Sequence, residues 1–385
     1  MAYLDHAATT PMLPAALDAY VRAARELGNA SSLHASGRAS RRIVEEGRER
    51  IAAALGASPS EVVFTGSGTE ADNLAVKGTH WARRTGRRNR VVTTAIEHHA
   101  VADPVAWLGD HERADISELS VDKFGRVEVD HLAELLESHA DEVTVVTCMW
   151  ANNEVGTLQP IREIVDLAAA HDIPVHTDAV QAVGHTPVDF GASGATSLAL
   201  SGHKLGGPAG TGVLLLARDA ECTPLLHGGG QEREIRSGTL DVPGIAALAE
   251  AVDHAVATRS AEADRLAALR DDLVSRVRAV VPEAVYNGDP ERRLPGNAHF
   301  SVPGCEGDAL LMLLDAAGVE CATGSACSAG IAQPSHVLLA MGADEDLARS
   351  SLRFTLGWSS RSADVDALVA ALPEAVERAR SAGLS

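Results

Sequence analysis

The segment Ile173-Pro174-Val175-His176-Thr177-Asp178-Ala179-Val180-Gln181 shows the repeating pattern of this chain. It predicts a short apolar strand that ends in a carboxylate. Six further runs of β-branched and apolar residues alternate with amphipathic stretches, at about residues 61–65, 90–94, 115–120, 143–149, 196–201 and 212–217. Several of these runs are apolar at nearly every position, which is typical of strands covered on both faces. The alternation predicts an α/β fold with a large, mostly parallel sheet and helices on both sides.

The pattern changes after a long helical stretch at about residues 242–280. Beyond it we predict a strand at 297–302, a helix at 307–317, a Gly/Ser/Ala-rich loop around 323–332, a helix at 335–341, a strand at 350–355 and a final helix. This order is typical of a smaller α+β unit. We therefore expect a large α/β domain over residues 16–255 and a small α+β domain formed by residues 1–15 and 256–385.

The length, net charge and hydrophobicity of the chain exclude or disfavour several classes of protein. The chain has 385 residues, enough for more than one compact unit, and a formal net charge of −20. This acidic balance disfavours broad nucleic-acid binding, which needs a basic surface to replace counterions. No run approaches the roughly 20 apolar residues needed to cross a bilayer. The first residues also lack the basic and apolar parts of a secretory signal.

The cysteines favour a reducing compartment. They are Cys148, Cys222, Cys305, Cys321 and Cys327. An odd number at wide spacing is not a disulfide framework, and the sequence contains no Cys-x-x-Cys of the zinc-ribbon or thioredoxin kind. We therefore expect a cytoplasmic protein.

Two motifs place reactive groups at strand ends. Ser201-Gly202-His203-Lys204 follows an apolar strand, and the glycine-rich turns after it allow other groups to approach Lys204 closely. A lysine that reacts with a carbonyl must lose its proton, so burial or a nearby cation has to lower its pKa. Asp178 ends the preceding strand, at the edge where open α/β sheets bind ligands, and its carboxylate could pair with a protonated pyridine nitrogen. The plainer alternatives are a surface lysine in a loop and an aspartate that caps a helix.

Two more segments offer groups for phosphate binding and proton transfer. Phe64-Thr65-Gly66-Ser67-Gly68-Thr69-Glu70 predicts a strand, a turn of small residues and a helix start, whose free N–H groups favour a phosphate. It matches neither the P-loop nor the dinucleotide-binding pattern, and an ordinary glycine turn is the alternative. In Glu97-His98-His99, an imidazole could lie over an aromatic ring or move protons. A metal site there is disfavoured, because neighbouring side chains diverge and no third ligand is suitably spaced.

The C-terminal part carries a candidate nucleophile and a candidate anion site. Cys327 lies in the run Cys321-Ala322-Thr323-Gly324-Ser325-Ala326-Cys327-Ser328-Ala329-Gly330, whose small side chains favour an accessible, reactive thiol. The alternatives are a buried free cysteine and a disulfide with Cys321, which a reducing compartment disfavours. Arg353 lies in an apolar strand, where an unpaired charge is costly. We therefore expect it to bind a carboxylate of the protein or of a substrate.

Taken in order, these motifs resemble those of the NifS-type cysteine desulfurases. They are the Gly-Thr-Glu turn, the histidine at 98, Asn152-Asn153-Glu154, Asp-x-x-Gln at 178–181, Ser-Gly-His-Lys, Arg236-Ser237-Gly238-Thr239, the cysteine at 327 and the arginine at 353. These enzymes use pyridoxal 5'-phosphate (PLP) and belong to the class V aminotransferase superfamily. The resemblance runs from Tyr3-Leu4-Asp5-His6-Ala7-Ala8-Thr9-Thr10-Pro11 to Leu352-Arg353-Phe354-Thr355-Leu356-Gly357. The Gly-Ser-Ala-Cys segment is similar to the long-loop group of the family.

The resemblance implies the fold of PLP-dependent transferases of fold type I and a role for each motif residue. Lys204 would bind the cofactor covalently, and Asp178 would pair with its pyridine nitrogen. Gln181 would contact the phenolic oxygen. His98 would stack on the ring and help in proton transfer.

The resemblance also implies a phosphate site and a homodimer. Gly68, Thr69, Ser201 and His203 would hold the phosphate, and Thr239 would reach the phosphate of the neighbouring subunit, so the active sites would be shared. The turn reads Gly-Ser-Gly-Thr here, where the family more often has Ser-Gly-Gly/Ala-Thr. We expect the site to be retained, because both orders supply small residues and backbone donors.

The implied reaction takes sulfur from L-cysteine and yields L-alanine. Asn153 and Arg353 would bind the substrate carboxylate, Lys204 would move the α-proton, and Cys327 would accept the sulfur as a persulfide. A carbon–sulfur lyase or an aminotransferase would share Lys204 and Asp178 but needs no protein nucleophile, so Cys327 separates these alternatives. A non-enzymatic scaffold is disfavoured, because every expected catalytic position is filled.

The partners implied by the resemblance are sulfur-acceptor or scaffold proteins. Iron–sulfur cluster assembly, tRNA thiolation, cofactor synthesis and a specialised pathway are all open as destinations of the sulfur. The use of selenocysteine is open as well. The cysteine run continues as Cys-Ser-Ala-Gly, where Cys-Thr-Ser/Ala is commoner, a difference that we expect to affect partner docking more than chemistry.

Overall fold

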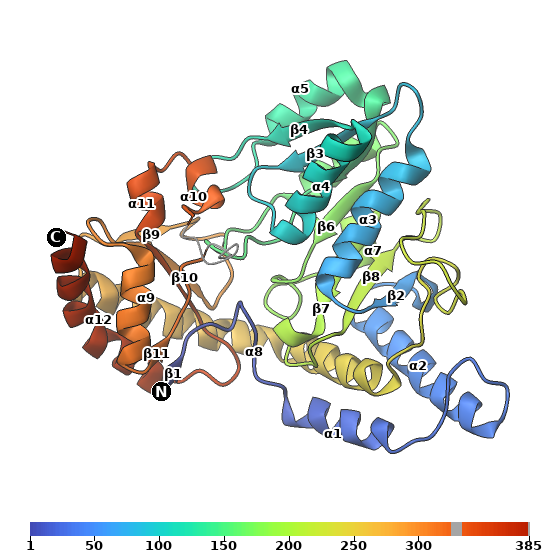
Figure 1. Cartoon of the computed structure of the whole chain (residues 1–385), viewed down its shortest axis with the longest axis horizontal. Coiled ribbons are helices and arrows are strands. Elements are labelled where there is room, and N and C mark those ends of the chain that lie inside the picture. The colour runs from blue at the N-terminus through green and yellow to red at the C-terminus, as the bar shows by residue number, and fades with distance from the viewer. Residues whose placement is uncertain (325–332, 384–385) are drawn as a thin grey trace.

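The computed structural model describes residues 1–324 and 333–383 and has a seven-stranded sheet at its centre (Figure 1). The strands are β2 (Val62–Thr65), β3 (Arg90–Thr94), β4 (Asp115–Leu119), β5 (Val143–Thr147), β6 (Val175–Asp178), β7 (Ser197–Ser201) and β8 (Gly212–Leu216). They lie in the order β2-β8-β7-β6-β5-β3-β4. Neighbours are parallel except that β8 runs antiparallel to β2 and β7. The seven strands predicted from the sequence are thus confirmed, together with the α/β fold class.

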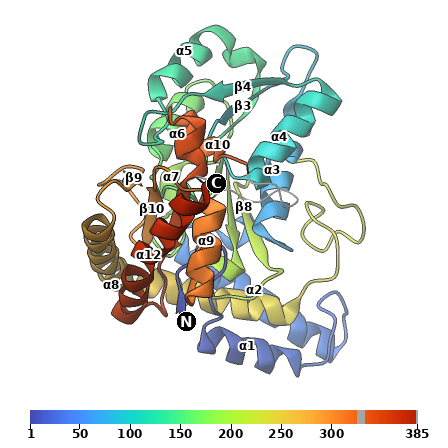
Figure 2. The ribbon, with the colours of Figure 1, turned by 60° about the vertical axis from the view of Figure 1, so that its left-hand side comes forward.

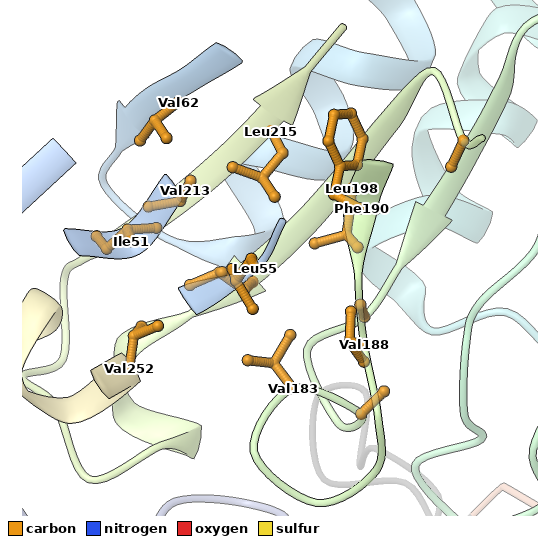
Figure 3. Close-up of a cluster of buried hydrophobic side chains, with 14 of the residues drawn as sticks. Ile51, Leu55, Val62, Val183, Val188, Phe190, Leu198, Val213, Leu215 and Val252 are labelled. Carbon is orange, nitrogen blue, oxygen red and sulfur yellow. The ribbon is translucent and has the colours of Figure 1, made fainter. Parts of the chain in front are cut away.

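Helices cover both faces of this sheet. They include α1 (Pro14–Ala24), α2 (Ala35–Ala54), α3 (Gly68–Arg83), α4 (His99–Glu112), α5 (Val129–His139), α6 (Ile161–Ala169), α7 (Phe190–Ser193) and α8 (Val242–Val280). Alternate residues of a strand point to opposite faces. In β8, Leu214 and Leu216 belong to the hydrophobic cluster of α3, whereas Val213 and Leu215 belong to that of α2 and α8. Figure 3 shows part of this second cluster.

The C-terminal part forms a second, smaller arrangement. Its elements are β9 (Val285–Asn287), β10 (Asn297–Ser301), α9 (Gly307–Ala316), β11 (Val319–Glu320), α10 (His336–Ala340), α11 (Glu345–Arg349), β12 (Ser351–Thr355) and α12 (Ser362–Gly383). An antiparallel sheet has the order β12-β10-β9, and β11 pairs in parallel with β1 (Ala2–Tyr3). Leu4 shares a hydrophobic cluster with Phe300 and Phe354, so the first residues of the chain pack against its last part. Figure 2 shows α9 and α12 side by side in this part.

The helix α8 connects the two arrangements (Figure 1). Its Val252 belongs to the cluster beneath the large sheet, whereas Leu266 and Leu273 belong to the C-terminal cluster. The helix predicted at 242–280 is confirmed, but β1, β9 and β11 were not predicted, because two or three residues are too few to show a period. Even this long helix, like the others in the described part of the chain, has no stretch apolar enough to cross a bilayer.

A buried ion pair holds the strand that leads into the predicted phosphate turn. Two oxygens of Glu232 accept from Arg48 Nη1 and Nη2 at 2.9 and 2.7 Å. The Glu232 side chain is 0% exposed and the Arg48 side chain is 4% exposed. Arg48 Nη1 also donates to the Val62 carbonyl at 2.6 Å, and Glu232 accepts from the Phe64 N–H at 2.9 Å. The first and third residues of β2 are therefore tied to this pair.

We predict that Glu232→Ala lowers the free energy of unfolding by about 3–5 kcal/mol, because it removes the buried, bidentate counter-ion of a buried guanidinium. Glu45→Ala is the matched control, since Glu45 also accepts from Arg48, at 3.1 Å, but is 37% exposed. This control should cost no more than about 1 kcal/mol. Urea unfolding followed by circular dichroism measures both variants. If both variants lost equally little free energy of unfolding, the buried pair would not be what holds β2.

Candidate active site

A cavity of about 220 Å³ opens at the carboxyl ends of the central strands. Nine residues predicted for the site line it, namely Gly68, Thr69, His98, Asn153, Asp178, Gln181, Ser201, His203 and Lys204. Asp178 and Ser201 are the last residues of the neighbouring parallel strands β6 and β7. Parallel strands present their carboxyl ends at one edge, so these residues meet although the chain separates them.

Lys204 ends a short 3₁₀ helix, η3 (Gly202–Lys204), directly after β7. Its Nζ donates to the carbonyls of Ala7 and Ala8, at 2.5 and 2.7 Å. Burial, aided by the positive charge of Arg353, lowers the Lys204 pKa to about 8. A sizeable fraction of the amine is therefore unprotonated near neutral pH, as reaction with a carbonyl requires.

Asp178 is a buried carboxyl group that lines the cavity. Its Oδ1 accepts from the Val180 N–H at 2.9 Å, so the capping role considered as the alternative is also present, as a local turn. Burial raises the Asp178 pKa to about 6, against the opposing effects of this hydrogen bond and of the charge on Lys204. A cation placed beside Asp178 would favour its ionised form.

A buried Asp–His pair that sequence reasoning missed lies next to Asp178. Asp72 of α3 lines the cavity, and its Oδ1 lies 3.1 Å from Nε2 of His176, whose Nδ1 lies 2.9 Å from Ser197 Oγ. Burial, together with the charge of Asp178, raises the Asp72 pKa well above its usual value, whereas burial lowers the His176 pKa to about 3. His176 is thus neutral at physiological pH, and Asp72 holds its proton more strongly than an ordinary aspartate does. No apolar pattern set these two residues apart, because β6 reads Val-His-Thr-Asp and Asp72 stands among other polar residues at the start of α3.

Two histidines at the cavity are neutral as well. His98 precedes α4, and its Nδ1 accepts from the Ala100 N–H at 3.1 Å. Burial, with a contribution from the charge of Lys204, lowers the pKa of His98 to about 4 and that of His203 to about 4. Since Nδ1 of His98 is an acceptor, the proton of the neutral ring lies on Nε2. His98 therefore offers one fixed N–H donor and a flat ring.

The predicted phosphate turn forms the start of α3. Ser67 caps the helix, because its side chain accepts from the Glu70 N–H at 3.0 Å, and this cap explains why the helix begins earlier than the predicted residue 70. A Cβ at Gly68 would lie 2.9 Å from Val180 Cγ2 and 3.2 Å from Ser201 Cβ, so only glycine leaves this wall open. The first N–H groups of α3 and the Ser201 hydroxyl form a cradle that suits a phosphate.

Arg353 has a carboxylate partner within the protein. Its Nη2 lies 2.9 Å from Asp5 Oδ1, and its Nη1 donates to the Asn153 carbonyl at 2.9 Å. The side chain does not line the cavity of the other nine residues, but its charge lowers the pKa of both Lys204 and His98. Arg353 is thus close to the site and is already paired.

Two of the residues predicted for the site, Thr239 and Cys327, remain to be considered. Thr239 is not among the residues that line this cavity, and Cys327 lies outside the described residues. Burial raises the Cys321 pKa to about 12, so this thiol keeps its proton at neutral pH. Among residues 1–324 and 333–383, no three side chains of His, Cys, Asp or Glu are grouped as a metal site would require.

Comparison with known proteins assigns the family. The model of the family "Aminotransferase class-V" matches residues 2–368. The chain belongs to the class-V aminotransferases. This class-V aminotransferase is 58% identical, over 388 residues, to the IscS-like cysteine desulfurase of Mycobacterium tuberculosis (strain ATCC 25618 / H37Rv), covering 100% of this chain and 98% of that protein. The resemblance to the NifS-type cysteine desulfurases is therefore confirmed.

Solved structures agree with this class-V assignment. A NifS-like protein superposes with a TM-score of 0.91 at 32% identity, over 98% of this chain and 100% of that one. The structure of SspA in complex with cysteine superposes with a TM-score of 0.80 at 30% identity, over 94% of this chain and 100% of that one. The fold predicted for PLP-dependent transferases is thereby confirmed.

We predict that Lys204 reacts with acetic anhydride in the cofactor-free protein with a pH midpoint near 8, because burial lowers its pKa to about 8. The reaction should rise as pH increases through this value, since only the unprotonated amine is nucleophilic. Competitive labelling followed by peptide mass spectrometry measures it, with the exposed Lys123 as internal reference. A midpoint near the 10.5 of an ordinary lysine would contradict the prediction.

Proposed function

We propose that this chain, a cysteine desulfurase, uses PLP bound at Lys204 to transfer sulfur from L-cysteine to its own Cys327. The observation that carries the proposal is the cavity that joins Lys204, with its lowered pKa, to the buried carboxyl group of Asp178. The 58% identity with a cysteine desulfurase over the whole chain supports the same substrate.

The residues present fit PLP. We propose that Lys204 binds the aldehyde carbon, that Asp178 pairs with the pyridine nitrogen, and that the flat ring of His98 stacks on the cofactor. Gln181 would contact the phenolic oxygen; at present its Nε2 donates to the Ala7 carbonyl at 3.0 Å. The bound cofactor supplies an electron sink for the charge that develops at the substrate carbon.

The phosphate site is proposed from the cradle at the start of α3. Gly68 and Thr69 would donate backbone N–H groups, and Ser201 and His203, which line the same cavity, would donate from their side chains. The family resemblance further implies that Thr239, which does not line the cavity of its own chain, would reach the phosphate of the neighbouring subunit.

The guanidinium of Arg353 and the amine of Lys204 suggest how the substrate is bound and how its α-proton moves. Asn153 lines the cavity and Arg353 donates to the Asn153 carbonyl, so the two would hold the α-carboxylate of cysteine together. Lys204 would take the α-proton and return it, since its pKa of about 8 allows both protonation states.

The sulfur step balances without an external oxidant. The Cys327 thiolate attacks the substrate sulfur, an S–S bond forms, and the C–S bond breaks with its electron pair left on carbon. That carbon takes up a proton and becomes the methyl group of L-alanine, while Cys327 is left as a persulfide. The substrate carbon is reduced and the sulfur is oxidised, so L-cysteine and the thiol yield L-alanine and the persulfide.

The wider setting is also proposed. The shared phosphate site implies a homodimer, and the exposed Leu17 of α1 and Leu27 and Leu33 after it, 50%, 86% and 88% exposed, support a partner on that side. We propose domains over 16–255 and over 1–15 with 256–385, supported by the two clusters that α8 joins. A cytoplasmic location, with transfer of the sulfur to acceptor or scaffold proteins, fits a thiol that must stay reduced.

We predict that Asp178→Asn keeps the fold but lowers turnover roughly a hundredfold or more, the order lost when a group that controls a proton at the reacting centre is removed. The amide cannot hold a proton on the pyridine nitrogen by charge. Alanine formation gives the rate, and the absorbance spectrum of the bound cofactor reports the change directly. Asp172→Asn, at a side chain that is 98% exposed, is the matched control. If the Asp178 variant turned over L-cysteine at the wild-type rate, the proposed pairing with the pyridine nitrogen would be wrong and this aspartate would only cap a turn.

We predict that Cys327→Ser still binds PLP and L-cysteine but makes almost no alanine and no persulfide, since a hydroxyl cannot accept the sulfur. The wild type incubated with L-cysteine should carry one added sulfur on the Cys327 peptide, removable by reductant and seen by mass spectrometry. Cys321→Ser is the control and should stay active, because burial raises the Cys321 pKa to about 12. Pyruvate and sulfide formed at full rate by the Cys327 variant would favour the carbon–sulfur lyase instead.

A further inference from the structure

Residues 4–10 lie across the active site and contact several of its side chains. The carbonyls of Ala7 and Ala8 accept from Lys204, and the Ala7 carbonyl also accepts from Gln181. On the same segment, Asp5 pairs with Arg353. A segment far away in sequence therefore supplies partners to three of the residues in the proposed machinery.

Backbone pairing fixes the position of Asp5 beside Arg353. Asp5 forms a parallel bridge with Thr355, the Thr355 N–H donates to the Leu4 carbonyl at 2.7 Å, and the His6 N–H donates to the Thr355 carbonyl at 3.3 Å. Arg353 precedes Thr355 by two residues in β12, so both side chains lie on one face of the strand. The carboxylate of Asp5 is thus placed by the fold and is not a chance surface contact.

The guanidinium of Arg353 is only partly satisfied. Asp5 contacts it through one oxygen at Nη2, and the Asn153 carbonyl takes one N–H of Nη1. Nε is buried and has no hydrogen-bond partner among the described residues. The side chain as a whole is 7% exposed. A guanidinium has five N–H donors in a planar fork that suits a bidentate carboxylate. The buried Nε–H has no partner among the described residues and Nη2 has only one, so donors remain for a second anion.

We propose that Asp5 is the resting counter-ion of Arg353 and that the α-carboxylate of the substrate competes with it for the guanidinium. The inference rests on the proposed role of Arg353 in substrate binding. Without substrate, the pair avoids an isolated buried charge, which is costly. With substrate, a second carboxylate must displace Asp5 or share the guanidinium against the repulsion of like charges. Asp5 is therefore a positioning residue whose charge weakens the binding of carboxylate-bearing amino acids.

The test is Asp5→Asn in the PLP-loaded enzyme. The KM for L-cysteine should fall about threefold to tenfold, because a larger fraction of Arg353 is free to bind, while kcat changes by less than about twofold. Asparagine keeps a carbonyl acceptor at the same place, so the arginine stays oriented. The dissociation constant of L-alanine, measured from the cofactor absorbance, should fall by the same factor. The binding of cysteamine, which lacks the carboxylate, should not change.

Glu320→Gln is the matched control. Glu320 lies opposite Tyr3 in the pairing of β11 with β1, so the variant removes a negative charge close to the same segment without touching the Asp5–Arg353 pair. It should leave the KM for L-cysteine and the L-alanine dissociation constant at their wild-type values. Asp5→Ser should change both in the same direction as Asp5→Asn, and thermal unfolding of each variant checks that the segment stays folded.

The outcomes separate this inference from the proposed function. If Arg353→Ala weakens L-alanine binding but Asp5→Asn leaves it unchanged or weaker, the counter-ion role is wrong and the substrate role of Arg353 stands. If Arg353→Ala leaves L-alanine binding unchanged, the proposed carboxylate site is wrong and the inference falls with it. In support, Asp5→Asn should have no effect on L-alanine binding when combined with Arg353→Ala, because the two groups act on the ligand through one pair.

Discussion

The parallel pairing of β6 with β7 is the constraint on which the rest of this structure depends. The register sets Asp178 opposite Ala199, so Ser201 and the η3 turn with Lys204 extend just beyond the carboxylate. Both strands are buried on both faces, and side chains at their ends therefore leave water when the sheet forms. The reactive lysine and its acidic neighbour are thus products of sheet burial as well as of sequence.

Burial also determines the charge state of the site. Asp72 and Asp178 line the cavity and Glu97 is buried close to them, and burial raises the pKa of Glu97 to about 8, of Asp178 to about 6 and of Asp72 well above its usual value. The histidines at the cavity are neutral, because burial lowers the pKa of His98 and His203 to about 4. A cationic ring nitrogen placed beside Asp178 would favour the ionised form of this carboxyl group.

The first residues of the chain and its C-terminal arrangement together contact the residues of the cavity. The first residues pair with β11 and β12. In the same segment, the Ala7 carbonyl accepts hydrogen bonds from Lys204 and Gln181. The carboxylate of Asp5 and the guanidinium of Arg353 meet there across 348 positions of sequence. Arg353 and Lys204 are consequently linked through one short segment of the chain, residues 5–8.

The sequence by itself determined the seven central strands, the long helix and most of the cavity residues. Local periodicity identifies strands and helices, and residues at the ends of parallel strands must converge at one edge. Only the tertiary structure decided that Asp72 meets His176, 104 positions away, and that Asp5 occupies Arg353. These contacts depend on how helix α3 and the N-terminal segment pack, and no local pattern of residues encodes a distance between segments that are remote in the chain. The pKa values follow the same division, because desolvation is a property of the packed surroundings and not of the residue type.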